Sequence, residues 1–346
     1  MKATYKQYLL QFKTPSGTSR GVLTTKETWF ILLEANGKRG IGECGLLRGL
    51  SIDDRPDYEA QLQWVCQNIH LGKEVLWEAL VEFPSIQFGV EMAFLSLESK
   101  TPFELFPSAF TENAKSIPIN GLVWMGDEGN MKAQIEAKID AGFTCIKLKI
   151  GALDFDKELG LLHYIRQNFK EEAIEIRVDA NGAFSSNEAL SKLNQLAGFK
   201  LHSIEQPIQK NNTDMMSVLC KSTPIPIALD EELIGVLTAD DKEVLLQKVR
   251  PQYIILKPSF IGGFRGTLEW IALANKYKIG WWITSALESN IGLNAIAQFT
   301  YLQHNPMPQG LGTGGLYTNN FECPLTVSEG QLWYRHETPW EVPFYR

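Results

Sequence analysis

Five ionisable residues recur at nearly even spacing in the second half of the chain, each at the end of a short apolar, strand-like run. They are Lys149 in CIKLKIG, Asp179 in IEIRVDANG, Glu205 in HSIEQP, Asp230 in IPIALDEE and Lys257 in YIILKPS. The steps between them are 30, 26, 25 and 27 residues, the length of one strand–helix unit. Burying a charge costs free energy unless a partner compensates it, so five buried in register are hard to explain structurally. We interpret them as charges that five neighbouring strands direct at one shared point, which is an active site.

The three carboxylates of this series, Asp179, Glu205 and Asp230, predict a divalent metal site. Octahedral Mg²⁺ prefers oxygen ligands, and three acidic side chains leave positions for substrate oxygens and water. We therefore expect Mg²⁺, for which Mn²⁺ could substitute. Strand alternation places Asp230 and Glu232 on one face and Glu231 on the other, so the assignment within this trio stays open.

The lysines predict proton transfer at carbon. Lys147 and Lys149 are two residues apart on one strand and therefore share a face, while Lys257 would enter the same pocket from the opposite side. Like charges and a nearby cation disfavour protonation, so Lys147 and Lys149 are expected to lower each other's pKa. A lysine that is neutral near pH 7 can act as a base. Mg²⁺, helped by Lys147, would stabilise the negative charge that develops when a proton beside a carboxylate is removed.

The elements that must position these residues alternate between strand and helix. Eight strand-like runs with seven helices between them are expected at residues 117–123, 144–150, 174–179, 202–205, 225–230, 252–257, 280–284 and 309–312. Parallel strands joined by helices form either an open doubly wound sheet or a closed barrel. Charges from successive strands that meet at one site favour the barrel, because barrel catalytic groups come from several strand ends.

The flanking segments differ in pattern from this α/β region. Residues 1–115 read as strands followed by helices, which is typical of an α+β domain. Residues 319–346 return to strand-like aromatic sequence and are expected to pack back on that first domain. The barrel would then span residues 116–318.

Bulk properties exclude several classes of protein. The net charge of −7 and the pI of about 5.4 argue against nucleic-acid binding. No apolar stretch is long enough to span a bilayer, and the first residues lack the features of a signal peptide. The five cysteines form no CxxC pair, and the five histidines show no zinc-binding spacing. We expect a cytoplasmic protein that acts on a small-molecule carboxylate, and the sequence leaves its oligomeric state open.

The site residues resemble a known family. Lys147-x-Lys149, the three carboxylates and the LKPS segment at Lys257 are similar to the muconate-lactonizing subgroup of the enolase superfamily. The resemblance covers nearly the whole chain. It implies an N-terminal α+β capping domain followed by a modified TIM barrel of the (β/α)7β type. The subgroup includes cycloisomerases, dipeptide epimerases, N-acylamino acid racemases and o-succinylbenzoate synthases.

Two segments favour one member of this subgroup. TSALESNIGLNAIAQ at residues 284–298 and PQGLGTGGLYTNNF at residues 308–321 look most like the o-succinylbenzoate synthases. Dipeptide epimerases typically carry an Asp-x-Asp pair on the last strand to hold an ammonium group. Here Gly312, Thr313 and Gly314 offer N–H and hydroxyl donors, which suit an anion. A tight turn that needs positive φ is the alternative explanation for the glycines. An N-acylamino acid racemase or a dipeptide epimerase remains the alternative function.

The resemblance implies dehydration of 2-succinyl-6-hydroxy-2,4-cyclohexadiene-1-carboxylate to o-succinylbenzoate, a step of menaquinone biosynthesis. Lys149 would remove the proton next to the ring carboxylate and return it to the leaving hydroxyl, and Lys257 would stabilise the intermediate as a cation over the ring. The expected substrate contacts are Asn181, Ser285, Gly312 and Gly314.

Three arginines leave alternatives open. Arg177 shares a strand face with Asp179, and a buried ion pair explains it as well as a role in the site does. The loops at residues 13–21 and 45–51 are rich in Gly and Ser and are expected to close over the substrate. Arg20 or Arg48 could meet the succinyl carboxylate there, although ordinary surface loops would look the same.

Overall fold

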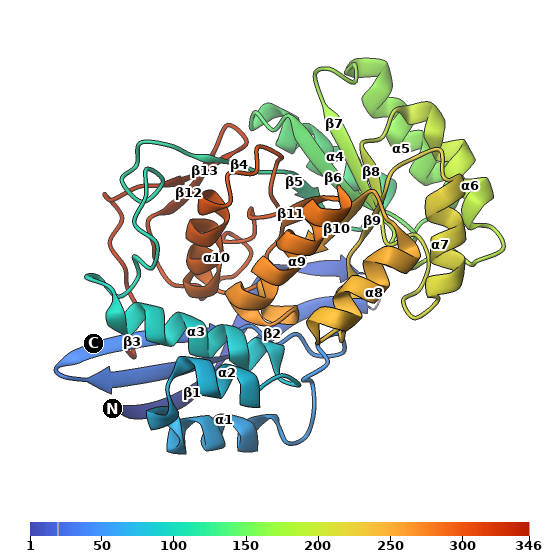
Figure 1. Ribbon diagram of the computed structural model, residues 1–346. Coiled ribbons are helices and arrows are strands. Elements are labelled where there is room, and N and C mark those ends of the chain that lie inside the picture. The colour runs from blue at the N-terminus through green and yellow to red at the C-terminus, as the bar shows by residue number, and fades with distance from the viewer. Residues whose placement is uncertain (19–20, 346) are drawn as a thin grey trace.

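Three long antiparallel strands open the chain and form the sheet of the capping domain. They are β1 (Lys2–Thr18), β2 (Gly21–Ala35) and β3 (Lys38–Cys44), in the order β1-β2-β3. The computed structural model describes residues 1–18 and 21–345 (Figure 1). Asn36 and Gly37 have φ angles of 53° and 73° and make the two-residue turn between β2 and β3.

Three α-helices complete the capping domain and confirm its α+β organisation. They are α1 (Tyr58–Gln67), α2 (Lys73–Ala79) and α3 (Pro84–Glu98), with a short 3₁₀ turn, η1 (Ile69–Leu71), before α2. Helix α3 packs directly on β3 because two glycines meet there. A Cβ atom added to Gly42 would lie 1.9 Å from the carbonyl oxygen of Gly89, so neither backbone leaves room for a side chain.

Seven parallel strands form the second sheet, in the order β11-β10-β9-β8-β7-β6-β5. They are β5 (Gly121–Val123), β6 (Cys145–Lys149), β7 (Glu175–Asp179), β8 (Ser203–Glu205), β9 (Ile227–Leu229), β10 (Tyr253–Leu256) and β11 (Gly280–Ile283). The helices that follow them surround the sheet in Figure 1: α4 (Glu128–Asp140), α5 (Phe155–Asn168), α6 (Ala189–Leu196), α7 (Thr213–Ser222), α8 (Ala239–Val249), α9 (Gly263–Tyr277) and α10 (Asn290–Leu302). Among the described residues, no helix is long and apolar enough to cross a membrane.

Residues 309 and 310 close the sheet into a barrel. Gln309 bridges Ile119 on one edge, and Gly310 bridges Thr284 on the other, both in parallel orientation. The N–H of Asn120 donates to the Gln309 carbonyl over 3.0 Å, which completes the connection. The modified TIM barrel is therefore confirmed, but the expected eighth strand at residues 309–312 is reduced to these two bridges.

The strand expected at residues 117–123 is divided between two sheets. Its first part, β4 (Ile117–Pro118), pairs with a C-terminal hairpin formed by β12 (Leu325–Ser328) and β13 (Gln331–Tyr334), and only β5 belongs to the barrel. The N–H of Ile119 donates to the Gly330 carbonyl over 2.9 Å, which holds this segment on the hairpin. The end of the chain contacts the cap, where the Tyr345 hydroxyl donates to the Arg39 carbonyl over 2.7 Å.

Two short 3₁₀ turns matter for the site. The first, η3 (Glu231–Leu233), follows β9, and the second, η4 (Pro258–Phe260), follows β10. Each begins directly after one of the charged residues that the sequence singled out, so the backbone turns sharply at Asp230 and at Lys257. The remaining 3₁₀ turn of the barrel region, η2 (Ala197–Phe199), extends α6.

Candidate active site

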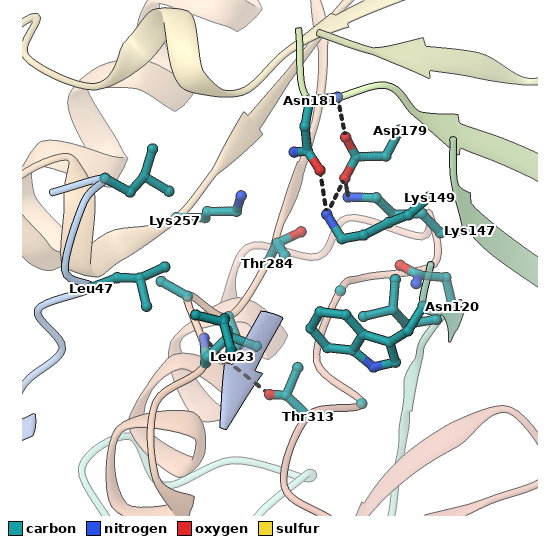
Figure 2. A pocket seen from close by; sticks show the side chains of 18 of the residues that line it. Leu23, Leu47, Asn120, Lys147, Lys149, Asp179, Asn181, Lys257, Thr284 and Thr313 are labelled. Atoms are coloured by element: carbon teal, nitrogen blue, oxygen red, sulfur yellow. Dashed lines mark hydrogen bonds and ion pairs between the residues drawn. The ribbon is translucent and has the colours of Figure 1, made fainter. Parts of the chain in front are cut away.

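A pocket lies where the carboxyl ends of the barrel strands face the cap, the position of active sites in TIM barrels. The cap contributes apolar side chains to it: Leu23, Leu47 and Leu50. The barrel contributes the charged ones: Lys147, Lys149, Asp179 and Lys257. Figure 2 shows Lys257 entering from the side opposite Lys147 and Lys149, as the sequence predicted.

Lys147 and Asp179 form the buried centre of the charged group. The Lys147 ammonium lies 2.9 Å from Asp179 Oδ2 and also contacts Glu205 Oε2. Burial alone would lower the pKa of Lys147, but the attraction of Asp179, Glu205 and Asp230 outweighs it and raises this pKa above the ordinary lysine value. Burial would raise the pKa of Asp179, but Lys147, Lys149 and Lys257 together hold it well below its usual range.

Lys149 faces the pocket and is held at two points. Its ammonium donates to Asp179 Oδ2 over 2.9 Å and to Asn181 Oδ1 over 2.7 Å. Asn181 has a φ of 44°, in the left-handed region, and its own N–H donates to Asp179 Oδ1 over 3.0 Å. This bend after β7 turns the Asn181 amide back towards the lysine.

Lys257 and Asp230 form the opposite wall. Each directly follows a strand, β10 and β9 respectively, and their side chains are in direct ionic contact. Burial opposes protonation of Lys257, but Asp230 and Glu205 raise its pKa. The lowered pKa expected from the sequence is therefore wrong for Lys147 among the protein groups alone, because the attraction of the surrounding carboxylates outweighs burial.

The three adjacent acids after β9 point in different directions. Asp230 contacts Lys257, the Glu231 carboxylate accepts from Asn181 Nδ2 over 2.9 Å, and Glu232 accepts from Gln206 Nε2 over 3.1 Å. The alternation that placed Asp230 and Glu232 on one face is wrong, because the strand ends at Leu229 and the chain continues as a 3₁₀ turn. Asp230 is the member of the trio that faces the lysines.

Asp179 and Glu205 end adjacent strands, Asp230 directly follows the next one, and all three are 0–2% exposed. In the described part of the chain, no three acidic, histidine or cysteine side chains are spaced as metal ligands, and lysine ammonium groups contact all three carboxylates. Glu205 Oε1 is nevertheless buried without a hydrogen-bond partner there, and burial and Asp179 raise the pKa of Glu205. In chemistry, though not yet in spacing, three buried carboxylates with one oxygen that has neither a hydrogen bond nor an ionic contact are the oxygen donors that a hard divalent cation takes.

Only some of the predicted substrate contacts line the pocket. Asn181, Ser285 and Gly312 line the pocket, whereas Gly314 is not among the lining residues. The Ser285 hydroxyl donates to Glu288 over 2.6 Å and accepts from Thr313 over 3.0 Å, so it is engaged within the protein. Neither glycine has a positive φ, so the turn explanation fails for both.

Thr284 is a pocket residue that the sequence interpretation missed. Its hydroxyl is buried, has no hydrogen-bond partner among the described residues, and lies between Lys257 and Lys149 in Figure 2. Thr284 directly follows β11, just as Lys257 directly follows β10. The step from 257 to 284 is 27 residues, so continuing the even spacing of the charged series would have found it.

Arg177 and Arg48 do not line the pocket. Arg177 donates to Glu175 over 2.7 Å and to the Pro308 carbonyl over 2.8 Å, and its guanidinium lies 4.3 Å from the Trp282 ring centroid, which identifies it as a buried structural ion pair. Arg48 pairs with Glu27 and Asp54 and does not line the pocket. Arg20 lies outside the described residues.

Comparison with known proteins gives concordant matches over both halves of the chain. Residues 130–336 match the family described as enolase C-terminal domain-like, and residues 2–97 match the MenC N-terminal domain. An o-succinylbenzoate synthase from Desulfotalea psychrophila is 47% identical over 96% of this chain and 98% of its own length. One from Vibrio cholerae is 27% identical over 93% of this chain and 92% of its own.

Solved structures agree with these matches. The crystal structure of MenC from Desulfotalea psychrophila superposes with a TM-score of 0.86 at 44% identity, covering 96% of this chain and 99% of that one. An L-Ala-D/L-Glu epimerase from Bacillus subtilis superposes with a TM-score of 0.82 at 20% identity, covering 99% of this chain and 97% of that one. The second likeness bears on the fold alone.

Proposed function

Because the chain belongs to the o-succinylbenzoate synthase family of the enolase superfamily, we propose that it converts 2-succinyl-6-hydroxy-2,4-cyclohexadiene-1-carboxylate to o-succinylbenzoate in menaquinone biosynthesis. The observation that carries this proposal is the placement of Lys149 and Lys257 on opposite sides of one pocket with Asp179 beside them. Such an arrangement suits removal of a proton from carbon on one face of a ring and stabilisation of charge on the other.

Three carboxylates would hold the divalent cation of the proposed enzyme. Asp179, Glu205 and Asp230 are the ligands, and Mg²⁺, or Mn²⁺ in its place, would supply positive charge for the substrate carboxylate as negative charge develops there. Lys147 contacts both Asp179 and Glu205, so its ammonium adds a second positive charge at the same place. This charge makes a proton beside the carboxylate acidic enough for a lysine to remove.

Lys149 is the proposed base. Asp179 and Asn181 fix its side chain, so the amine, once neutral, is aimed into the pocket without a search through rotamers. It takes the proton from the carbon next to the ring carboxylate, which gives an enediolate. The ring then expels its hydroxyl group, and the same proton returned by Lys149 makes the leaving group water.

Lys257 and the pocket walls complete the proposed reaction. The Lys257 ammonium, kept protonated by Asp230, would face the ring as a cation and stabilise its developing negative charge. The Thr284 hydroxyl, which has no partner within the described chain, is placed to donate to a substrate oxygen. Leu23 and Leu47 cover the ring from the cap and exclude water.

An N-acylamino acid racemase remains the second candidate, because lysines on opposite sides of one pocket also suit proton exchange at a chiral carbon. Dipeptide epimerase is disfavoured by the pocket lining. Among the described residues that line it, the only acid is Asp179, which the proposed cation would occupy, so no carboxylate is left for a substrate ammonium. An N-acylated amino acid has no such ammonium and is not excluded on this ground.

The proposal is tested by incubating the purified chain with the cyclohexadiene substrate and Mg²⁺ and following the formation of o-succinylbenzoate. We expect turnover that falls to background when a chelator removes the cation and returns on addition of Mg²⁺ or Mn²⁺. Absence of product with saturating Mg²⁺ would refute the assignment.

A further inference from the structure

Three buried ionisable groups meet at the boundary between cap and barrel, outside the set of residues that line the pocket. Lys26 on β2 and Glu43 on β3 come from the cap, and Glu288, in the loop after β11, comes from the barrel. They are 2%, 0% and 0% exposed. The mechanism proposed above uses none of them, so their burial needs a separate explanation.

The Glu288 carboxylate connects two segments that form walls of the pocket: residues 285–287, and the η4 segment that follows Lys257. Its Oε1 accepts from the Ser259 hydroxyl, and its Oε2 accepts from the Ser285 hydroxyl over 2.6 Å and from the Ala286 N–H over 2.7 Å. Ser285 and Ala286 line the pocket, as does Leu287, which is held at a φ of 67°. A residue other than glycine adopts that φ only when its surroundings impose it. Here the Glu288 carboxylate binds Ser285 and Ala286, the two residues that precede Leu287.

The bond to Ser259 reaches the segment that carries Lys257. Ser259 lies in η4, whose turn closes through a hydrogen bond of 2.8 Å from the Phe260 N–H to the Lys257 carbonyl. Pro258 fixes φ between the two residues. Anchoring Ser259 therefore restrains the backbone from which the Lys257 side chain extends.

The cap contacts the barrel at Glu288 and at the N-terminus of α10. Glu43 accepts from the Ser289 N–H over 2.9 Å and from the Gly292 N–H over 2.8 Å, at the N-terminus of α10. A Cβ atom added to Gly45 would lie 2.4 Å from Ser259 Oγ and 3.1 Å from Glu288 Cγ, so the cap loop touches both residues. Leu47 and Leu50, which cover the pocket, follow in that loop.

Lys26 supplies the positive charge of the cluster. Its ammonium is buried and makes no hydrogen bond within the described residues. Burial lowers its pKa, while attraction by Glu43 and Glu288 opposes that change. Because Lys26 and Glu43 belong to the cap and Glu288 to the barrel, undocking the cap would remove the cation from Glu288.

We infer that Glu288 is a positioning residue, which aligns the backbone of Lys257 with the wall formed by residues 285–287 once the cap has docked beside it. Lys26 and Glu43 support this alignment, because they hold the cap against the residues that Glu288 binds. This inference rests on the proposed function, because Lys257 is assigned a role only there.

The test uses substitutions at Glu288 and Ser259, with Glu91 as a matched control. Glu91 is also buried between cap and barrel, where it accepts from the N–H groups of Phe264 and Arg265 at the start of α9, but it does not line the pocket. Glu91→Ala should therefore lose stability while kcat stays within about twofold of the wild-type value, as expected for a substitution remote from the site.

The expected kinetics separate positioning from mere stabilisation. Ser259→Ala should lower kcat about tenfold with KM nearly unchanged, because a shifted Lys257 loses contacts made to the intermediate. Glu288→Ala should lower kcat about 100-fold and raise KM, since both walls move. Glu288→Gln keeps the shape of the side chain and can keep its three contacts, so kcat should remain within about fivefold of wild type.

Two results would overturn the inference. One is folded Ser259→Ala and Glu288→Ala variants with kcat within twofold of wild type. The other is a Glu91→Ala variant that loses as much kcat as Glu288→Ala. If Glu288→Ala does not fold, an unchanged kcat in Ser259→Ala alone is enough to overturn it. A wild-type chain without dehydratase activity would instead refute the proposed function, so the two failures are distinguishable.

Discussion

The two ends of the barrel bury charge in different ways, and strand β7 shows both. Arg177 and Asp179 are two residues apart on this strand and 1% and 0% exposed. Arg177 is held by Glu175, by the Pro308 carbonyl and by the face of Trp282. Asp179 is held by Lys147 and Lys149, which border the pocket.

The difference shows that burial of a charge does not by itself mark a functional site. Each cluster leaves polar atoms without a hydrogen-bond partner among the described residues: Arg177 Nη2 at one end and both Glu205 oxygens at the other, of which Oε2 is in ionic contact with Lys147. The Arg177 guanidinium is covered by an aromatic ring, whereas the charges around Glu205 adjoin a pocket. Access to a ligand therefore distinguishes the two ends.

The largest effect is expected at Lys149. Lys149→Ala removes the proposed base, so kcat for dehydration should fall by about 10³-fold or more while the melting temperature changes little. Initial rates of product formation measure this, and Lys248→Ala provides the control because that side chain is 45% exposed and pairs only with Asp214 in the described chain. Retention of a tenth of the wild-type kcat would mean that the base lies elsewhere.

The next effect concerns the metal ligands. Saturating Mg²⁺ at about 100 times its Kd should stabilise the wild-type chain by about 2.7 kcal/mol, which raises the melting temperature by several degrees. Glu205→Gln removes one ligand, so most of this rise and the catalytic activity should be lost together. A thermal melt of each protein with Mg²⁺ and with chelator checks it. An equal Mg²⁺ shift in both proteins would remove Glu205 from the metal site.

Arg177→Met tests the lower end of the barrel. Removing one partner of a buried pair leaves Glu175 without its cation, so the free energy of unfolding should fall by about 2–4 kcal/mol. The folded variant should keep kcat within about threefold of wild type, since Arg177 makes no pocket contact. Denaturant unfolding and initial rates give the two numbers. A large loss of kcat at normal stability would reverse the comparison between the two ends.

The smallest effect extends the comparison to the cap–barrel boundary and depends on pH. Burial raises the pKa of Glu91 from 4.5 to about 7. The folded state therefore binds a proton more tightly than the unfolded chain, and the stability this gives is lost as pH rises from 4.5 through 7. We expect a decline on the order of 1–3 kcal/mol that is absent in Glu91→Gln.

The measurement is the difference in melting temperature between wild type and Glu91→Gln, taken from pH 5 to pH 8. Using the difference cancels the contribution of Asp53, whose pKa burial also raises, to about 6. A difference that stays constant over this range would show that Glu91 titrates normally. Activity should be equal in the two proteins at every pH.

The sequence predicted the upper end of the barrel well because each charge there follows a short apolar run at a strand end. Lys149, Asp179 and Glu205 end β6, β7 and β8, and Lys257 directly follows β10. Local pattern is enough for such positions. It could not separate the roles of Glu231 and Glu232, because the change from strand to 3₁₀ turn at Asp230 depends on packing rather than on periodicity.

Other features depend on contacts between distant segments. Alternation gives Arg177 the same face as Asp179 but does not say which end of the barrel it reaches. The eighth strand shrinks to two bridges where Gly310 packs against Thr284, with 2.4 Å between an added Cβ atom and Thr284 Oγ1. The hydrogen bonds between Glu43 and Ser289 join residues 246 positions apart, so no local sequence pattern predicts them.

The measurement that tests the central claim most directly compares two reactions of the same pocket. Purified wild-type chain with Mg²⁺ is given the cyclohexadiene substrate in one experiment. In another it is given each enantiomer of an N-succinylamino acid in D₂O, and kcat/KM is determined for dehydration and for deuterium exchange. We predict that dehydration is the more efficient reaction and that Lys149→Ala abolishes it. Fast exchange from both enantiomers with dehydration near background would contradict the account and assign the two lysines to racemisation.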